Sequence, residues 1–437
     1  MTEPVIDAFL LSRLQFAFTV TFHFLFPAFT IGLAWWLLAL EFNWLRTRDE
    51  RYRSLYKFWV KVFAVSFGLG VVSGIVMSYQ FGTNWSGYAT FAGSVLGPII
   101  GYEVITAFFL EASFLGIMLF GWNRVGDRLH FVSTCMVAFG TLLSAFWILA
   151  ANSWMQTPAG YEIANGRAEP LDWLEIIFNP SFTYRYLHAV LGAFLTTAFA
   201  IAGLSAYMML RGRGDHAVRT SFSMALWFAT IFIPIQILLG DQQGLVVRDY
   251  QPAKLAAMEG HWRNEPGEAV PLILFGIPDE AAEETKYAIE IPYLSSLIVT
   301  HSWDGTFPGL DSFPREDRPP VFLTFWAFRI MVAIGLMMLL VVVLSLWLRR
   351  RRRLYDTRWF QWLSLAMLPS GFIAVSTGWF TAEIGRQPYV VHGLLRTEDA
   401  LSPVSTGEVM ATLAAFVLVY SFVFAAGTYY LFKIMRK

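Results

Sequence analysis

Two histidines lie in stretches of this sequence that are otherwise apolar. His23 lies in the run FAFTVTFHFLFPAFT and His188 lies in YRYLHAVLGAF. A neutral imidazole is a common metal ligand, and histidine is an axial ligand of haem iron. Gly192 follows His188 by about one helical turn and leaves room for a flat macrocycle. A hydrogen-bonded histidine that only stabilises the structure is the alternative for both positions.

Two glutamates, Glu103 and Glu111, lie in a third apolar run. On an α-helix their spacing places them within roughly 80° of one face and about 12 Å apart along the axis. Stacked carboxyl groups in an apolar helix are typical of a proton path, because burial favours their proton-carrying form. Carboxylates that only hydrogen-bond neighbouring helices are the alternative.

A further set of candidates lies near the C-terminal end. Trp379, Glu383 and Arg386 follow one another at spacings that predict a shared helix face. Glu383 and Arg386 form a structural ion pair, or Glu383 ligates a haem iron while Arg386 binds a haem propionate. Arg329 and Met331 point in different directions on their helix. A thioether suits low-spin haem iron, although most methionines in helices are core residues.

The composition shows which elements must hold these side chains. Hydrophobic residues form 56% of the 437 residues and charged residues 15%, whereas soluble domains carry roughly a quarter charged residues. The net charge of zero gives no reason to expect a nucleic-acid partner, and the lone Cys135 excludes a disulfide framework. Apolar runs of about 20 residues cross a bilayer. Nine are present, at 14–41, 58–80, 94–121, 131–152, 184–210, 218–240, 321–348, 359–383 and 408–433.

Basic residues mark alternate connections between the nine runs. They concentrate in the first, third, fifth and seventh connections and at the C-terminus, and the densest group is 349–353. Loops rich in arginine and lysine remain in the cytoplasm. The sequence therefore predicts an all-α, polytopic transmembrane bundle of nine helices, with its N-terminus periplasmic and its C-terminus cytoplasmic.

This pattern divides the chain into three parts. We expect helices one to six in residues 1–240, a long periplasmic loop in residues 241–320, and helices seven to nine in residues 321–437. Within the loop, KLAAMEGHW at 254–262 has helical spacing. It predicts a surface helix at the membrane rim, suited to an amphipathic ligand. A folded cap that only covers the bundle is the alternative.

The small number of histidines excludes two classes of respiratory protein. Haem–copper oxidases and bis-histidine cytochromes b need more ligands than the two histidines deep in the apolar runs. Two histidines, a methionine and a glutamate suffice for two or three haems with open coordination sites. A secondary transporter is the main alternative, but the internal repeats and broken helices typical of transporters are not evident in the sequence.

Several motifs follow one another along the chain. In order these are SRLQFAFTVTFHFLFP at 12–27, EVITAFFLEASFLG at 103–116, GWNRVG at 121–126, NSWMQTPAGYE at 152–162, GDQQG at 240–244, KLAAMEGHW at 254–262, FWAFRIM at 325–331 and GWFTAEIGRQPY at 378–389. Together they resemble one family, subunit I of the cytochrome bd quinol oxidases, over nearly the whole chain. The short loop and Tyr389 after GRQP resemble the cyanide-insensitive branch, some of whose members lack haem d.

The resemblance implies nine helices and three haems. It implies that His188 and Met331 are the axial ligands of a low-spin haem b. His23 and Glu383 resemble the ligands of two high-spin haems, one a haem b and the other a haem d or a further haem b.

The resemblance also assigns other residues. Arg13, Arg329 and Arg386 resemble arginines of the haem pockets, and Trp379 the aromatic residue among the haems. Three residues match the family's proton route: Glu103, Glu111 and Ser144. Three match the residues of its quinol loop: Asp241, Lys254 and Glu259.

The activity implied is quinol oxidation at the periplasmic side of a bacterial inner membrane. Oxygen is reduced to water with cytoplasmic protons, which generates a proton motive force without pumping. The implied partners are subunit II in a heterodimer, a small accessory transmembrane subunit in some members, and membrane lipid. A haem-binding electron carrier without oxygen chemistry is the alternative within the redox class.

Overall fold

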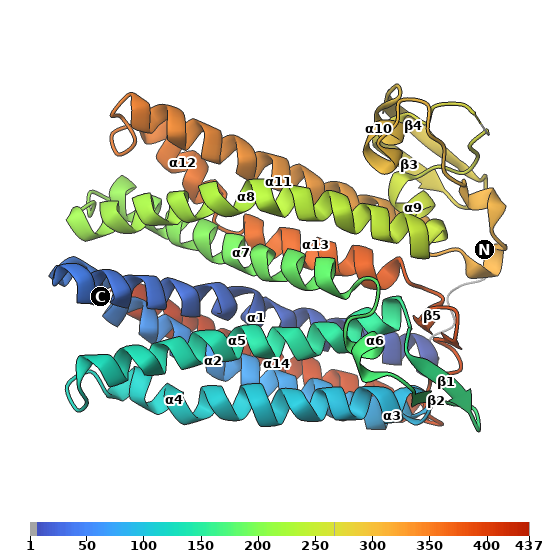
Figure 1. Cartoon of the computed structure of the whole chain (residues 1–437), viewed down its shortest axis with the longest axis horizontal. Coiled ribbons are helices and arrows are strands. Elements are labelled where there is room, and N and C mark those ends of the chain that lie inside the picture. The colour runs from blue at the N-terminus through green and yellow to red at the C-terminus, as the bar shows by residue number, and fades with distance from the viewer. Residues whose placement is uncertain (1–6, 266, 437) are drawn as a thin grey trace.

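The computed structural model describes residues 7–265 and 267–436 (Figure 1). Within these residues nine helical segments are long and apolar enough to cross a membrane, which confirms the predicted number. They are α1 (Ala8–Thr47), α2 (Glu50–Thr83), α3 (Ser86–Tyr102) continued by η1 (Glu103–Phe108) and α4 (Phe109–Phe120), α5 (Asp127–Gln156), α7 (Phe182–Leu210), α8 (His216–Tyr250), α11 (Val321–Arg350), α12 (Arg358–Ala366) with α13 (Ser370–Ile384), and α14 (Thr406–Arg436).

Aspartate residues at the N-cap position mark where three of these helices begin. Asp7, Asp49 and Asp215 precede α1, α2 and α8, and each carboxylate accepts a hydrogen bond from a backbone N–H of the first turn. Aspartate is among the best residues for this position because the first turn of a helix leaves its N–H groups without partners.

Most helices are longer than the predicted runs, and three differ from them in a way that affects the site. α8 continues ten residues past position 240, to Tyr250, so the first part of the predicted loop is helical. The third span contains a π-helical segment, η1, which alters the regular spacing assumed between Glu103 and Glu111. The eighth span is broken between α12 and α13, next to Pro369, which has no N–H to donate. The argument that broken helices are lacking was therefore wrong.

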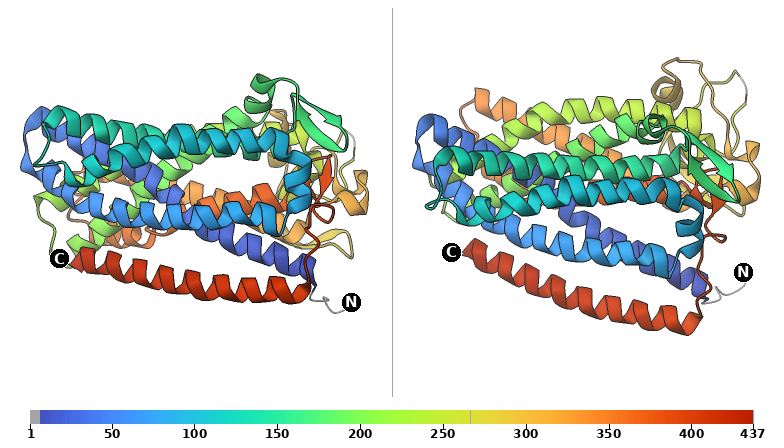
Figure 2. Two further views of the ribbon diagram at one scale, coloured as in Figure 1. Left: turned by 90° about the horizontal axis from the view of Figure 1, so that it is seen from below. Right: turned by 60° about the horizontal axis from the view of Figure 1, so that its bottom comes forward.

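The helices form two packed halves (Figures 1 and 2). One half contains α7, α8, α11, α12 and α13, and the other contains α1 to α5 with α14 along its outer edge. α7 joins the halves by packing against both α1 and α5. A large core cluster fills the space between them, with Trp36, Phe63 and Phe199 almost fully buried.

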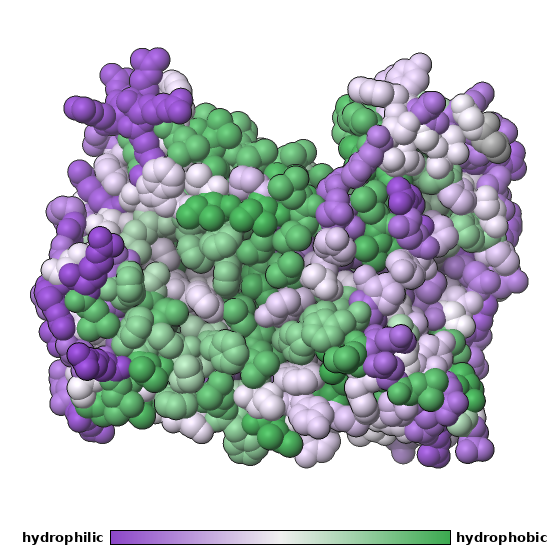
Figure 3. All heavy atoms as spheres, viewed as in Figure 1, coloured by the Kyte–Doolittle hydropathy of each residue, from purple (hydrophilic) through white to green (hydrophobic). Residues whose placement is uncertain are grey.

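The ends of the bundle differ in charge. The four basic connections and the C-terminus lie together at the left end in Figure 1, as the alternation of charge predicted. An apolar belt separates two polar ends in Figure 3. At the opposite end, three hairpins and two short helices form a cap: β1–β2 (Tyr161–Ala164, Arg167–Pro170), β3–β4 (Leu272–Asp279, Glu284–Ile291), β5–β6 (Tyr389–Val391, Leu395–Arg396), α9 (Pro252–Glu259) and α10 (Leu294–Thr300).

The helix α9 was predicted from the sequence, but it was expected to lie on the surface. All residues from 254 to 259 are buried, because α9 packs between α8 and α11 beneath the β3–β4 hairpin. The expectation of a surface helix was therefore wrong. The helix ends at Gly260, whose φ of +77° is a left-handed conformation that glycine adopts readily.

Candidate functional site

His188 lies on α7, turned toward α8. Its Nε2 lies 3.2 Å from the side-chain nitrogen of Gln236, while its Nδ1 is buried without a hydrogen-bond partner among the described residues. A Cβ added at Gly240 would lie 3.2 Å from the imidazole Cε1. The imidazole therefore occupies space that this glycine leaves free, and one of its nitrogens is free to bind a ligand.

Met331 lies on α11 in the same half of the bundle. A Cβ at Gly378 on α13 would lie 2.8 Å from its sulfur. At Gly192 on α7, a Cβ would lie 3.3 Å from a methyl group of Val375 on α13. Glycines thus allow close approach of α7, α8, α11 and α13 around the two side chains, which fits a flat ligand held by an imidazole and a thioether.

His23 lies on α1 against α2. Its Nδ1 lies 3.0 Å from the hydroxyl of Ser73, and a Cβ at Gly74 would lie 3.0 Å from its Cε1. One residue further along α1, Phe24 stacks on Trp379 of α13 at a centroid distance of 5.1 Å. The structure therefore brings Trp379 next to the His23 segment, although the two lie in different halves of the bundle.

Glu383 lies at the end of α13 in a buried polar cluster. It forms an ion pair of 2.5 Å with Arg386, whose guanidinium lies just beyond the helix end. Its other oxygen accepts hydrogen bonds from Asn152 at 3.0 Å and Gln156 at 3.4 Å, both on α5. Asn152 in turn accepts a hydrogen bond from Arg185 of α7. The ion pair of Glu383 with Arg386 is therefore present. The predicted helix face that both share with Trp379 is wrong, because α13 ends at Ile384, before Arg386.

This cluster holds more cations than anions. Lys254 donates to Gln156, Gln251 and the Ala382 carbonyl at 2.9 to 3.0 Å, and burial holds the pKa of its ammonium well below its ordinary value. Nε and Nη1 of Arg386, and Nε of Arg185, are buried without partners among the described residues. Buried cations require counter-charge. The cluster therefore fits a bound group that carries carboxylates, such as the propionates of haem.

Glu259 and Arg329 form a second buried ion pair, at 3.2 Å. Glu259 also accepts from Ser295 at 2.9 Å, and Arg329 donates to the Ile273 carbonyl at 2.7 Å. Five residues separate Glu259 from Lys254, which places them on different faces of α9. The structure therefore separates these two candidates, because Lys254 joins the Glu383 cluster and Glu259 contacts α11 and the cap.

The other candidates lie apart from these clusters. Ser144 on α5 donates to Glu103 at 2.7 Å, and Gly140, one turn earlier, contacts the side chain of Glu111. Asp241 accepts from His301 of the cap at 3.2 Å. The guanidinium of Arg13 lies 3.5 Å from the Gln387 side-chain oxygen, one residue after Arg386.

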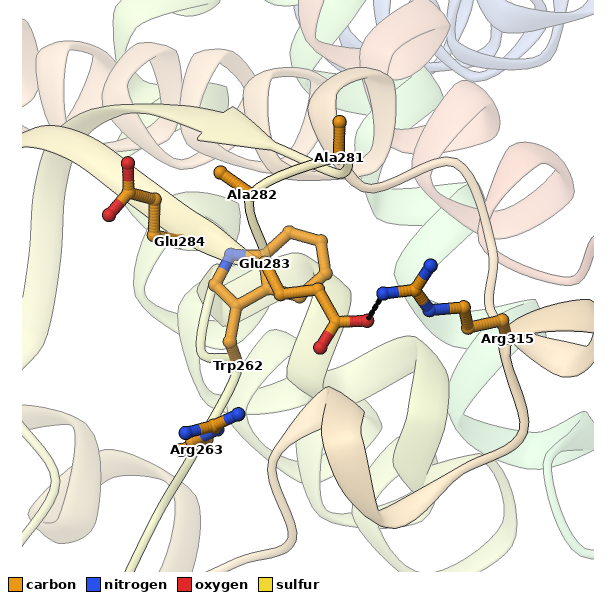
Figure 4. Close-up of a pocket in the computed structure, with 7 residues that line it drawn as sticks. All are labelled: Trp262, Arg263, Ala281, Ala282, Glu283, Glu284 and Arg315. Carbon is orange, nitrogen blue, oxygen red and sulfur yellow. Dashed lines mark ion pairs between the residues drawn. The ribbon is translucent and has the colours of Figure 1, made fainter.

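A polar pocket of about 350 Å³ lies in the cap, away from all of these residues (Figure 4). Glu283 and Arg315 form an ion pair of 2.6 Å across it, beside the indole of Trp262. It contains Trp262, the last residue of the motif at 254–262, but none of the candidate site residues, so we do not assign it to the site.

Sequence reasoning missed several residues that the structure places in these clusters. Arg185 lies one turn before His188 in an apolar run, which was a signal for function. Asn152 and Gln156 lie in a quoted motif but received no role. Outside these clusters, Glu41 at the end of the first apolar run pairs with His130 of α5, and neither residue had been given a role.

The nine long apolar helices of the described residues define a polytopic membrane protein, and its buried histidine, methionine and glutamate side chains are of the kinds that ligate haem iron. The sequence profile described as cytochrome bd terminal oxidase subunit I matches residues 11–437. The chain belongs to this family, and it is a multi-pass protein of the bacterial inner membrane.

Individual relatives agree with this assignment. The chain is 38% identical over 420 residues to a Bacillus subtilis (strain 168) protein named cytochrome bd ubiquinol oxidase subunit 1, covering 94% of this chain and 90% of the relative. It is 34% identical to the Escherichia coli (strain K12) cytochrome bd-II ubiquinol oxidase subunit 1, covering 98% and 96%. A chain of the bd oxidase structure from Geobacillus thermodenitrificans matches with a TM-score of 0.92 and 32% identity over 98% of both chains.

Proposed function

We propose that this chain is the haem-bearing subunit of a quinol:oxygen oxidoreductase, in which quinol is oxidised near the cap and oxygen is reduced to water inside the bundle. The observation that carries the proposal is the match to a bd oxidase over 98% of both chains. The buried residues described above supply ligands and charges of the kinds that this chemistry needs.

His188 and Met331 would hold a low-spin haem b between α7, α8, α11 and α13. His23 and Glu383 would hold two high-spin haems, a haem b and a haem d or a further haem b. Arg13, Arg386 and Trp379 would fix and separate these groups. When bound, the haems transfer electrons and bind oxygen. The excess of buried cations around Glu383 supports this assignment, because it stabilises negative charge on the bound groups.

The Glu259–Arg329 pair and Lys254 would serve the quinol side, with Asp241 nearby at the end of α8. A quinol must lose protons as it loses electrons. A buried carboxylate that already accepts from Ser295 is placed to take such a proton, while Arg329 holds it in position. Glu103, Glu111 and Ser144 would carry the protons that oxygen reduction consumes.

The direction of these steps follows from the charges of the loops. The basic end is the cytoplasmic one, so the cap and the quinol side are periplasmic. Protons released on one side and consumed from the other separate charge without a pump. The functional form would be a heterodimer with subunit II, in some members with a small accessory subunit, and would be embedded in lipid.

The test is a dithionite-reduced minus air-oxidised visible spectrum of the complex purified from native membranes, together with quinol-dependent oxygen uptake. We expect low-spin and high-spin b features and oxygen uptake. A red-shifted chlorin band in addition identifies haem d. The b features without this band keep the oxidase assignment and place the protein in the branch that lacks haem d. A correctly assembled complex without haem would contradict the proposal and favour the transporter alternative.

A further inference from the structure

A fully buried carboxylate lies near the basic end of the bundle, outside the clusters described above. Glu41 on α1 is 0% exposed, and its Oε1 lies 2.6 Å from Nδ1 of His130 on α5. Its Oε2 accepts from the hydroxyl of Thr134 at 2.6 Å. The Tyr56 hydroxyl lies 3.0 Å from that of Thr134. Every polar atom of the carboxylate therefore has a partner.

The imidazole of His130 is less completely satisfied. His130 is buried, and its Nε2 has no hydrogen-bond partner among the described residues. Trp122 packs edge-to-face on the ring at a centroid distance of 4.5 Å. An unpaired nitrogen in a native core requires an explanation, because burial without a partner is unfavourable. Exchange of protons between this nitrogen and water that enters the bundle here would explain why Nε2 lacks a partner in the protein.

Cations lie on the outer side of Trp122. Arg53 lies 5.4 Å from the Trp122 ring and exposed Lys57 lies 5.9 Å from it, both on α2. Trp122 therefore contacts both the buried imidazole of His130 and two basic side chains of α2. The other titratable groups beside the pair are Tyr56 on α2 and Cys135, which follows Thr134 on α5.

The helix α5 connects this pair to the other buried carboxylates. Five polar side chains of α5 fall within a sector of roughly 80°, whereas Ser133, Ser153 and Gln156 of the same helix lie outside it. The five are His130, Thr134, Thr141, Ser144 and Asn152.

Successive glutamates from other helices meet this polar face of α5 or its edge. Glu41 meets Thr134, Glu111 contacts Gly140 and Glu103 meets Ser144. Thr134 and Gly140 lie about 9 Å apart along the axis of α5. Water must therefore bridge the gap between Glu41 and Glu111.

We propose that Glu41 and His130 are the proton-loading station at the basic end of this path. The inference rests on the proposed function and extends its proton route by one station. A proton from water binds His130 Nε2, and the proton on Nδ1 passes to Glu41. The carboxyl group then releases it through water toward Glu111. Exchange with water returns the imidazole to its first tautomer, because Nδ1 gains one proton while Nε2 loses one. One proton enters, one leaves and no electrons move.

The experiment compares Glu41→Gln, Glu41→Asp and His130→Asn in the complete oxidase complex. Ser133→Ala is the matched control, because Ser133 is equally buried on α5 and donates only to its own helix. The readouts are the visible spectrum, anaerobic haem reduction by quinol, oxygen uptake from pH 5.5 to 9, and proton uptake from the lumen of vesicles with the basic end inside.

We expect Glu41→Gln and His130→Asn to lower oxygen uptake and proton uptake together by roughly tenfold or more. Their spectra and their rate of haem reduction by quinol should equal those of the wild type, and Glu41→Asp should restore part of the turnover with a shifted pH profile. Wild-type turnover in either substituted complex overturns the inference and leaves the oxidase intact. Loss of haem in both variants also overturns it, because the pair is then structural. An inactive wild type contradicts the proposed function itself.

Discussion

Individual buried polar groups account for most of the proposed chemistry, because each is held by partners from other helices. Glu383 is positioned by Asn152 and Arg386, and Glu259 by Arg329. Removing one member of a buried pair leaves the other charge uncompensated, which costs about 3–5 kcal/mol. Substitutions that keep size and hydrogen-bonding capacity therefore separate functional from structural roles better than alanine does.

Met331→Leu tests the axial ligand of the low-spin haem. Leucine fills nearly the same volume, and such exchanges usually cost less than about 1.5 kcal/mol. We expect the low-spin α-band of the reduced-minus-oxidised spectrum to be lost or strongly weakened while the high-spin features remain. Met338→Leu, at a buried methionine of the same helix, is the control and should leave all bands unchanged. An unchanged low-spin band in Met331→Leu would show that another residue ligates this haem.

Glu259→Gln tests the quinol side. The change removes the charge that pairs with Arg329 and accepts from Ser295, an interaction of a kind that contributes about 1.5–3 kcal/mol. We expect kcat/KM for quinol to fall by roughly 10- to 100-fold, with the haem spectrum unchanged. Glu290→Gln, at an exposed position of β4, should have no effect. Quinol kinetics equal to those of the wild type would remove Glu259 from the site.

At the scale of the elements, the nine apolar runs were predicted because a bilayer imposes a minimum length of apolar sequence. The helices that pack against one another were not predicted, because a run of hydrophobic residues does not specify which helix packs against it. The burial of α9 and the meeting of Trp379 with α1 depend on these tertiary contacts. The extension of α8 was missed because GDQQGLVVRDY is polar, and only the apolar part of a helix is visible as a membrane span.

Glycines at helix contacts are the element feature with the most direct test. A Cβ at Gly378 would lie 2.8 Å from the Met331 sulfur, whereas a Cβ at Gly335, one turn after Met331, meets no atom within 4 Å. Gly378→Ala should therefore displace the thioether and shift or abolish the low-spin band. Gly335→Ala should leave the spectrum unchanged and raise the melting temperature slightly, because alanine favours helix. Equal spectra for both variants would show that Met331 does not require this close approach.

Considered as a whole, the molecule has its basic connections at one end and its cap at the other (Figure 1). Charge alternation alone predicted this separation, since the polarity of loops depends on sequence and not on packing. The full set of residues that form the site was harder to predict from the sequence. The ligand candidates were recognised as isolated polar residues, while the cations around Glu383 became apparent only when α5, α7, α9 and α13 were brought together.

Orientation is tested by labelling in a Cys135→Ala background. A cysteine at Ala281, in the turn of the β3–β4 hairpin, should react with a membrane-impermeant maleimide in intact spheroplasts. A cysteine at Arg213, in the exposed connection between α7 and α8, should react only in inverted vesicles. The reverse pattern would place the cap in the cytoplasm and reverse the proposed directions of proton release and uptake.

The wide separation of His188 and Met331 along the chain has a consequence for biogenesis. The ribosome completes α7 and α8 before the part of the cap that contains α9, β3, β4 and α10, and α11 and α13 only after this part. The pocket between α7, α8, α11 and α13 therefore does not exist while the first half of the chain is inserting. If His188 and Met331 hold the low-spin haem as proposed, its capture is a late step, and a chain that ends before α13 lacks this haem however well its first helices are inserted.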